Sequence, residues 1–433
     1  MLDIKFIRAN PEIVKNAAAV KGFKCPVDTV LELDKRVREL KTITQNKTAE
    51  KNKITAQIAS AGPCERAPLV AESKKLGAEI DADEMILRAA EHELNDLLHH
   101  VPQIPCPNSP IGPDDTFNTI AKTVGAARTF DFNVRPHYEI LDMNGWWMPE
   151  KTADICGSRA YTLMGEAAEL DLAMHVYAVQ KMIARGFTYI QVPAIVKPQM
   201  VFDAGHFPGN DLSIMDNDVY YLNVPDRALS GTGEIVINSL HRNEILSQDQ
   251  LPILYAGYSP CFRKEAGAAG RDTRGLIRFH QFHKIEQFVF CEPKDSEKFH
   301  AMLLEILEEI MRDLELPYRT VNISTGDMGF NKVKQHDIEA WMPAQATYRE
   351  LGSCSSIGEF QARRTNTRYR ENGTNEVKFV ATLNNTGLVL PRTLAAVIEN
   401  HQNADGSVNI PRALQPLMGG RKVIPAKAGI HCK

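Results

Sequence analysis

The segment from Cys261 to Phe290 decides the fold of this chain: CFRKEAGAAGRDTRGLIRFHQFHKIEQFVF. It holds two strand-like runs separated by a polar loop that contains three glycines. Because alternate side chains of a strand share a face, Arg263 and Glu265 should point the same way on the first run. On the second run, residues 276–290, five side chains should share one face: Arg278, His280, Phe282, Lys284 and Glu286. The sequence thus predicts a hairpin with a row of charges around one aromatic ring.

Two interpretations of this charged face stay open from the residues alone. An antiparallel sheet with one side in water has the same alternation of polar and apolar residues. A ligand site with an aromatic platform and two arginines for phosphates explains the position of Phe282 and the long polar loop better. The chain has no G-x-x-x-x-G-K-[ST] sequence, so a bound nucleotide would not be held by a P-loop.

The hairpin lies in a part of the chain with mixed helical and strand patterns. Apolar residues at helical spacing predict one helix over residues 170–184 and another over 297–314. Residues 187–196 predict a strand ending near Pro193, and Phe379–Thr386 predicts a further strand. The helix after that strand should begin near Pro391, since proline suits the first helical turn. We therefore expect an α+β domain.

Residues 28–100 differ from the rest, because they contain no Trp, Tyr or Phe and few turn residues. Steps of three and four residues give two helical seams on either side of an Ala-Gly-Pro break at 61–63. The seams run through Leu33, Val37, Leu40, Thr44, Lys47, Lys51, Ile54 and Ile58, and through Leu69, Ser73, Leu76, Ile80, Asp83, Leu87, Ala90, Leu94 and Leu97. This pattern predicts an antiparallel two-stranded coiled coil, loosely packed where Lys47 and Lys51 interrupt the seam.

The first of these helices is rich in basic residues. Seven lie between positions 35 and 53, against two glutamates: Lys35, Arg36, Arg38, Lys41, Lys47, Lys51 and Lys53. From charge alone a solvated face is the better interpretation. Five prolines within residues 101–113 indicate a linker after this arm, and the basic residues 421–433 show no periodicity and predict a disordered tail.

Composition is that of a soluble globular protein, with 43% hydrophobic and 24% charged residues and a net charge of −4. The net charge argues against nonspecific nucleic-acid binding over the whole surface. The eight cysteines include no C-x-x-C pair, which makes a zinc ribbon improbable and favours free thiols in a reducing compartment. The N-terminus does not look like a signal peptide and no apolar run is long enough to span a membrane, so we expect a cytoplasmic protein without membrane contacts.

The segment FRKEAGAAGRDTRGLIRFHQF, Phe262–Phe282, resembles motif 2 of the bacterial-type seryl-tRNA synthetases. The helix and strand ending at Pro193 resemble motif 1, the dimer motif of class II synthetases. Three segments together resemble motif 3: LNNT at 383–386, PRTL at 391–394 and Glu399-Asn400. The sequences ELGSCS at 350–355 and FQARR at 360–364 are further signatures of the seryl type. The resemblance covers residues 1–420.

This resemblance implies a class II antiparallel sheet flanked by helices, with an N-terminal antiparallel coiled-coil arm. The implied domains are a tRNA-binding domain (1–105, arm about 28–100), a catalytic domain (106–420) and the tail (421–433). The implied activity is serine–tRNA ligase, with L-serine, ATP, Mg²⁺ and tRNA(Ser) as ligands, and tRNA(Sec) as a further substrate. The family also implies a cytoplasmic homodimer.

The family's ATP-binding and catalytic roles fall on motif residues of this chain. Arg263 would bridge the serine carboxylate and the α-phosphate, Glu265 would contact adenine, and Phe282 would stack on it. Arg278 and Arg392 would hold the terminal phosphates, while Glu350 and Ser353 would bind Mg²⁺. The catalytic residues would be Arg263, Glu350 and Arg392. The full ATP set would be Arg263, Lys264, Glu265, Arg278, Phe279, Phe282, Glu350, Leu351, Gly352, Ser353 and Arg392.

The implied serine pocket comprises Thr232, Gly233, Glu234, Arg263, Glu286, Asn384 and Thr386. Thr232 and Glu234, expected on one strand face, would hold the substrate ammonium, and Glu286 with Thr386 would take the hydroxyl. A carboxylate that accepts from a hydroxyl is left unpaired by alanine, so alanine would be rejected. Gly233 stands where Ser or Ala is more familiar and should make the Thr-x-Glu loop more flexible. Ser356, Glu359 and Leu390-Pro391 are further departures, none of which removes a charged catalytic group.

Two other functions compete with this interpretation. A synthetase-like ligase that loads an amino acid onto a carrier protein would share the class II core but lack the helical arm of residues 28–100. A catalytically dead paralogue acting as an RNA-binding protein should have lost Arg263, Glu286, Glu350 or Arg392, and all four are present. Exchange of ATP and pyrophosphate with serine discriminates among the three.

Overall fold

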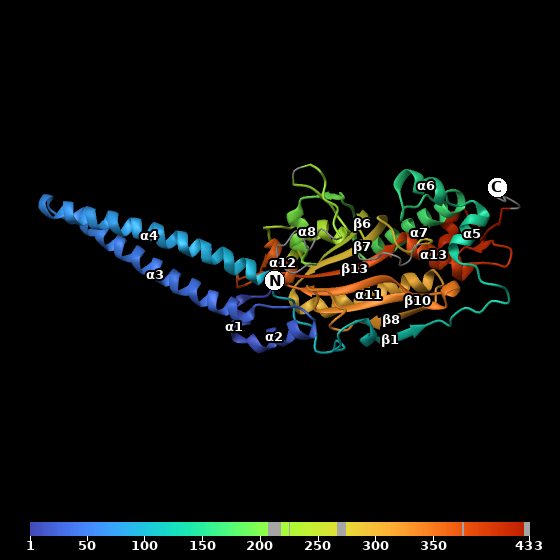
Figure 1. Ribbon diagram of the computed structural model, residues 1–433, viewed down its shortest axis with the longest axis horizontal. Helices are drawn as coiled ribbons and strands as arrows, with labels where there is room; N and C mark the ends of the chain where they lie inside the picture. Colours follow the sequence, from blue (N-terminus) through green and yellow to red (C-terminus); the bar gives the residue numbers. More distant parts are fainter. Residues whose placement is uncertain (207–217, 225, 266–273, 375, 428–433) are drawn as a thin grey trace. The chain divides into compact units, whose positions relative to one another are not determined.

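The computed structural model describes residues 1–206, 218–224, 226–265, 274–374 and 376–427 (Figure 1). The chain divides into two compact units. The first comprises residues 1–19 and 23–102, and the second comprises 20–22 and the described residues from 103 onward. Each unit is described separately below.

The first unit is entirely helical in its described residues. It contains α1 (Ile4–Ala9), α2 (Pro11–Val20), α3 (Val27–Ser60) and α4 (Pro63–Leu98). The two long helices run side by side in Figure 1, joined by two residues at 61–62. Seam residues Leu33, Val37, Ile54, Ile80 and Leu94 are buried. The predicted helical hairpin is confirmed.

The two lysines in the α3 seam do not leave it loose, contrary to the expectation. The Lys47 ammonium lies 2.7 Å from a carboxylate oxygen of Asp83 and 3.4 Å from one of Glu79, so an ion pair joins the helices. The Lys51 side chain lies over Gly77, whose missing Cβ would come within 3.1 Å of the Lys51 nitrogen. Charge pairing and a small residue opposite therefore replace apolar packing at these positions.

The second unit is built on an eight-stranded sheet. Its strand order is β1 (Thr119–Val124), β8 (Tyr318–Asn322), β9 (Lys334–Met342), β10 (Thr347–Gly358), β13 (Ala381–Val389), β7 (Gln281–Cys291), β6 (Ile253–Phe262) and β2 (Thr188–Gln191). All neighbours are antiparallel except β2 and β6, which are parallel. The predicted antiparallel sheet is confirmed.

Helices cover both faces of this sheet. The face with α7 (Gly165–Ala184), α11 (Ser296–Asp313) and α13 (Leu390–His401) holds the larger apolar core. The other face carries α8 (Pro198–Ala204), α10 (Gly233–Ser239) and α12 (Phe360–Thr365) beside a smaller core. Strand β7 contributes Ile285 and Val289 to the first core, and Phe288 and Phe290 to the second. A sheet with one side in water is thereby excluded at this hairpin.

Shorter elements complete the second unit. The helices are α5 (His137–Asn144) and α6 (Pro149–Cys156). The remaining strands are β3 (Ile195–Val196), β4 (Ala228–Leu229), β5 (Ile245–Ser247), β11 (Arg368–Arg370), β12 (Val377–Phe379), β14 (Val408–Asn409) and β15 (Val423–Ile424). No described helix has the length and apolar composition needed to cross a membrane.

Several predicted boundaries were wrong. The helix predicted from residue 170 begins at Gly165, and the strand predicted over 379–386 spans Ala381–Val389. Strand β7 begins at Gln281 and not at residue 276, because the Leu276 N–H donates to His137 Nε2 and the His280 N–H to the Arg159 carbonyl instead of to a neighbouring strand. The strand over 187–196 is shorter, since β2 ends at Gln191.

The tail was expected to be disordered from residue 421, but β15 pairs with β14 and the Lys427 N–H donates to Asn144. Residues 428–433 lie outside the described part of the chain. The α11 and α13 helices lie within one residue of their predicted positions, and Pro391 falls in the first turn of α13 as expected.

Candidate active site

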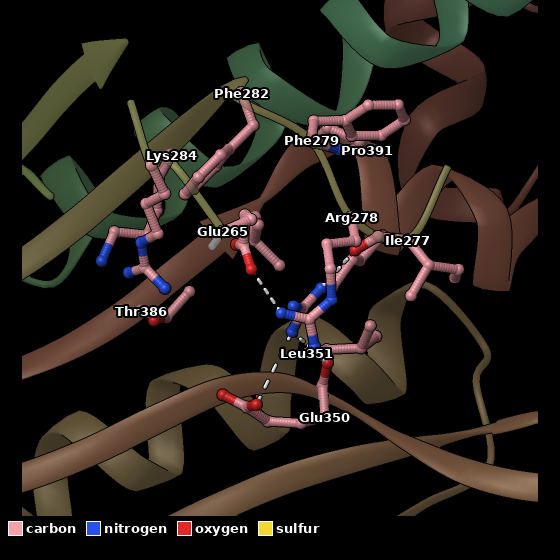
Figure 2. A pocket seen from close by; sticks show the side chains of 13 residues that line it. Glu265, Ile277, Arg278, Phe279, Phe282, Lys284, Glu350, Leu351, Thr386 and Pro391 are labelled. Atoms are coloured by element: carbon pink, nitrogen blue, oxygen red, sulfur yellow. Dashed lines mark hydrogen bonds and ion pairs between the residues drawn. The ribbon is translucent and has the colours of Figure 1, made fainter. Parts of the chain in front are cut away.

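A pocket of about 550 Å³, part of it open to solvent, lies where β6, β7, β10, β13 and the start of α13 meet (Figure 2). The residues that line it are Arg263, Glu265, Ile277, Arg278, Phe279, Phe282, Lys284, Glu350, Leu351, Thr386, Val389, Pro391 and Arg392. Nine of the residues expected to bind ATP or serine are in this set, although they come from segments more than a hundred residues apart.

Two of the arginines are associated with neighbouring side chains on the β6–β7 side. An Arg278 nitrogen lies 2.5 Å from a carboxylate oxygen of Glu265. The Arg263 guanidinium lies 5.5 Å from the centroid of the Phe282 ring and donates to the Gly231 carbonyl. Glu265 has a backbone φ of +54°, a conformation that is uncommon for non-glycine residues. A flat aromatic face and two guanidinium groups are thus held beside one hollow.

The third arginine enters from motif 3. Arg392 lies in the first turn of α13 and donates through Nε to the Ile277 carbonyl at 2.9 Å. Its Nη1 lies 3.6 Å from a Glu350 carboxylate oxygen. Figure 2 shows Glu265 and Glu350 pointing toward the central arginine groups from opposite sides. The pocket therefore offers positive groups at a helix N-terminus, an arrangement suited to phosphates.

A β-bulge explains how Glu350 and Ser353 share a face although they are three positions apart. Glu350 pairs with Glu339 and Ser353 with Asp337, and the register shifts between Glu350 and Gly352. Without the shift, an odd spacing would place the two side chains on opposite faces. The bulge thus brings a carboxylate and a hydroxyl to the same side of the sheet as Asp337.

This face suits a hard divalent cation that also contacts phosphates. The Ser353 Oγ is buried beside the Asp337 carboxyl group, and burial together with the Glu350 carboxylate raises the pKa of Asp337 to about 7. Mg²⁺ prefers oxygen ligands and takes only one or two carboxylates when substrate phosphates supply the rest. Among the described residues no three His, Cys, Asp or Glu side chains form a complete metal site. The residues present fit a magnesium ion shared with a nucleotide.

Thr232 and Glu234 were expected on one strand, and this was wrong. Thr232 is the N-cap of α10, and its Oγ1 accepts a hydrogen bond from the Glu234 N–H, as threonine does at helix starts. Gly233, expected to loosen this loop, is buried in the first turn of α10. A Cβ at Gly233 would lie 3.0 Å from Ser259 Oγ and 3.4 Å from Glu286 Cβ, so the helix start is packed closely.

Thr232 and Glu286 nevertheless meet in one buried cluster. The Thr232 hydroxyl donates to Glu286 at 3.2 Å, and Lys284 forms an ion pair with the same carboxylate. Thr386 lies opposite Glu286 on the neighbouring strand. Asn384 is buried, and its side-chain nitrogen has no hydrogen-bond partner in the described structure. These groups form an acceptor-rich recess that is continuous with the pocket through Lys284 and Thr386.

Burial disfavours the charged form of both carboxylates of this recess, but their pKa values shift in opposite directions. It raises the pKa of Glu286, with Lys284 opposing the shift. Burial also disfavours the charged form of Glu234, but His206, Lys284 and a hydrogen bond from Gln361 outweigh it and hold the pKa of Glu234 below its usual range. The Gln361 nitrogen donates to Glu234 at 2.7 Å. Glu234 is therefore the more firmly ionised of the two.

A buried relay supports the segment that carries Arg278. His137 donates from Nδ1 to Glu399 at 2.6 Å, and its Nε2 accepts from the Leu276 N–H at 2.8 Å. Glu399 also accepts from the backbone N–H groups of His137 and Ala344. A neutral imidazole with its proton on Nδ1 satisfies both contacts. Motif 3 is thus connected to the end of the motif 2 loop through α5.

Three expected nucleotide residues, Lys264, Gly352 and Ser353, do not line the pocket. The Lys264 ammonium lies 6.0 Å from the centroid of the Tyr221 ring, and a Cβ at Gly352 would meet Leu307 and Thr386. Sequence reasoning missed Lys284, Gln361, His206 and His137. Lys284 alternates with Phe282 and Glu286 on the predicted strand face, so its position was available, but nothing in the sequence indicated the other three contacts.

Comparisons with known proteins assign this architecture. Residues 222–401 match the model of the class II tRNA synthetase core domain (G, H, P, S and T), and residues 1–105 match that of the seryl-tRNA synthetase N-terminal domain. The chain is 43% identical over 427 residues to a serine–tRNA ligase of Deinococcus radiodurans, covering 98% of this chain and 99% of that one. The chain belongs to the seryl-tRNA synthetase family. The expected enzyme class, serine–tRNA ligase, is confirmed.

Two further relatives agree with this family. A serine–tRNA ligase of Symbiobacterium thermophilum is 39% identical and covers 96% of this chain and 98% of its own. The crystal structure of seryl-tRNA synthetase from Pyrococcus horikoshii complexed with ATP aligns with a TM-score of 0.91 at 35% identity. It covers 99% of this chain and 100% of that one, so the fold is shared over the full length.

His137→Phe should destabilise the second unit by about 2–4 kcal/mol, because it removes the side-chain donor to the buried Glu399 and leaves the Leu276 N–H without its acceptor. Urea unfolding followed by tryptophan fluorescence measures this unit alone, since all three tryptophans, Trp146, Trp147 and Trp341, belong to it. Glu139→Gln on the exposed side of α5 is the control, with an expected change below about 1 kcal/mol. Equal stability of the two variants would contradict the relay.

Proposed function

We propose that the enzyme activates L-serine with ATP and transfers it to tRNA(Ser), with tRNA(Sec) as a second acceptor. In the first step a serine carboxylate oxygen attacks the α-phosphorus of ATP, and pyrophosphate leaves as seryl-adenylate forms. In the second step a terminal ribose hydroxyl of the tRNA attacks the seryl carbonyl, and AMP and a proton are released. No side chain acts as nucleophile, so the residues work by positioning and electrostatics.

The observation that best supports this proposal is the imbalance of buried charges in the recess. Glu234 and Glu286 are buried carboxylates, and Lys284 is the buried cation beside them. Buried charges are stable only when paired, so this recess accommodates one more positive group. The ammonium group of an amino acid supplies that charge, and the adjacent Arg263 suits its carboxylate. His206, 3.1 Å from Glu234, would exchange this contact for the substrate.

The rest of the pocket accommodates the nucleotide. Phe282 would stack on adenine and Glu265 would accept from its edge, which requires Glu265 to release Arg278. Arg278 and Arg392 would then bind the terminal phosphates. Glu350 and Ser353 would hold Mg²⁺, which screens the phosphate charges when bound. Arg263 lies on the boundary between recess and nucleotide pocket, where it would neutralise charge as the carboxylate attacks.

Selection of serine would come from Glu286 together with Thr386. A hydroxyl on the substrate β-carbon donates to the Glu286 carboxylate, while alanine leaves that acceptor buried without the donor. Sites built to hydrogen-bond a hydroxyl reject the analogue without it strongly. The recess therefore favours serine over alanine and glycine.

The helical arm would bind the tRNA. Lys41 and Lys47 are paired with acidic residues of α4, so they are partly neutralised. Arg36 and Lys53 are exposed and have no acidic partner within 4 Å in the described part of the chain. Exposed cations along a helix suit phosphates of an RNA backbone. An arm of this kind also argues against a carrier-protein ligase.

The experiment that tests the proposed function is ATP–pyrophosphate exchange with serine, alanine, threonine and glycine. Serine alone should support fast exchange, and purified tRNA(Ser) should then be charged. Absence of exchange with every amino acid would favour the catalytically dead paralogue, although Arg263, Glu286, Glu350 and Arg392 are all present near the pocket.

Glu286→Ala should lower kcat/KM for serine about ten- to a hundred-fold, because a charge-assisted hydrogen bond of roughly 1.5–3 kcal/mol is lost. The KM for ATP should hardly change, since Glu286 does not line the nucleotide pocket. The ratio of kcat/KM for serine to kcat/KM for alanine should fall by a similar factor. An unchanged ratio of serine to alanine exchange would remove Glu286 from the specificity pocket.

Deleting residues 28–100 should leave serine activation largely intact and abolish tRNA charging, because the pocket residues all belong to the second unit. In the full-length enzyme, tRNA affinity should fall as salt rises, and Arg36→Ala with Lys53→Ala should reduce the salt slope. Normal charging by the armless protein would show that the RNA-binding role lies elsewhere.

We also propose that the enzyme is a cytoplasmic homodimer formed through residues 170–193. Leu172 and Ile183 on α7 are 63% and 52% exposed, which is high for apolar residues on a core helix. Light scattering at micromolar concentration should give twice the mass of 48.3 kDa. Leu172→Asp with Ile183→Asp should shift the mass toward that of the monomer, and a monomeric unmodified protein would refute the proposal.

A further inference from the structure

Lys284 is a buried lysine that none of the expected site roles includes. It lies on β7 two residues before Glu286, and only 8% of the residue is exposed. Its ammonium group forms an ion pair with Glu286 and donates to Thr232 Oγ1 at 2.8 Å. On the neighbouring strand β6 it faces Ser259, which has no charge. Lys284 therefore touches two of the side chains expected to contact the substrate amino acid, Glu286 and Thr232.

The position of Lys284 matters because two carboxylates share this recess. Glu234 and Glu286 repel one another, and burial disfavours the charged form of both. Lys284 acts on each of them in the opposite direction. Among the described residues, Cys261 on β6 also lies near Glu286, Arg263 lies near Cys261, and His206 is paired with Glu234. Of these groups only Lys284 contacts the Glu286 carboxylate directly.

We propose that Lys284 is a specificity-determining residue, whose ammonium group keeps Glu286 ionised so that this carboxylate accepts the hydroxyl proton of the substrate. An ionised carboxylate has only acceptors, and its hydrogen bonds are about twice as strong as those of a neutral group. A protonated Glu286 would satisfy itself partly by donating to Thr232 or Thr386. The penalty for a substrate without a hydroxyl would then shrink. This inference rests on the proposed activation of serine.

The test compares Lys284→Met, which keeps the length of the side chain but removes its charge, with the unmodified enzyme. Pyrophosphate exchange is measured with serine and with alanine between pH 6 and 9. At neutral pH, kcat/KM for serine should fall about ten- to a hundred-fold, while kcat/KM for alanine should change much less. Lys294→Met, at a position whose side chain is 68% exposed, is the matched control and should change none of these.

The pH profile separates this role from a merely structural one. The pKa of a buried carboxylate rises further when its cation is removed, so the acid limb of the serine profile should move to higher pH in Lys284→Met. Lys284→Arg, which keeps the charge, should restore most of the serine preference. The double variant Lys284→Met with Glu286→Gln has no titrating carboxylate at position 286 and should lose the acid limb.

The outcomes distinguish this inference from the proposed function. If the unmodified enzyme shows no exchange with serine, the proposed function fails. If it exchanges normally, but Lys284→Met keeps both its ratio of serine to alanine and its acid limb, Lys284 has no role in specificity. An acid limb that persists in the double variant would also overturn the inference, because the limb could not then come from Glu286. Circular dichroism of the double variant, whose two side chains are both neutral, controls for folding.

Discussion

Two carboxylates buried next to one another, Glu234 and Glu286, impose the constraint on which the rest of the site depends. Each would lose its charge in an apolar interior unless donors or cations surrounded it. Four side chains supply these contacts. Thr232 at the N-cap of α10 and Lys284 on β7 contact Glu286, while Gln361 in α12 and His206 after α8 contact Glu234. The family signature around Gln361 therefore has a physical purpose, since its amide fixes Glu234 from a segment more than a hundred residues away.

The antiparallel sheet makes this convergence possible. Its central strands β7, β13 and β10 come from separate stretches of the chain, and their register sets which side chains face the pocket. Bulges adjust that register where alternation would fail, between Glu350 and Gly352 in β10 and between Thr386 and Leu388 in β13. Helices cover both faces, so the strands are held rigidly around the pocket beside the start of α13.

Local patterns gave the elements of the fold well, and long-range contacts explain where they failed. The arm, α11 and α13 follow from helical periodicity because their apolar faces repeat over many residues. The start of β7 did not follow, because the backbone of Leu276 is bonded to His137 from a segment about 140 residues earlier. Thr232 was assigned to a strand by spacing alone, although threonine before a buried apolar run also fits a helix cap.

The candidate site could be assembled from sequence only through the resemblance to a family. The charged face of the hairpin was visible, but its connection to Glu350, Thr386 and Arg392 depends on strand order, which no local pattern contains. Lys284 was visible on that face and still had no role, because its importance lies in the number of carboxylates around it. That number is a property of three elements together and not of any segment.

The pocket also shows how an enzyme can hold many charges without a ligand. Arg278 is paired with Glu265, Arg392 with Glu350, and Lys284 with Glu286. Each pair keeps a cation in position near the place where a negative group would bind. A nucleotide that replaced Glu265 and Glu350 as partners of the arginines would free those carboxylates for an adenine edge and a cation. The two acidic side chains would then change partners rather than lose them. Because they are already removed from water in the unliganded pocket, binding does not have to desolvate them again. The pair of Lys284 and Glu286 differs, because in the proposed role Glu286 stays paired while it accepts the substrate hydroxyl. The two kinds of ion pair therefore suit different residues. A wide, planar guanidinium suits an exchange with phosphates, and a compact ammonium suits a permanent contact.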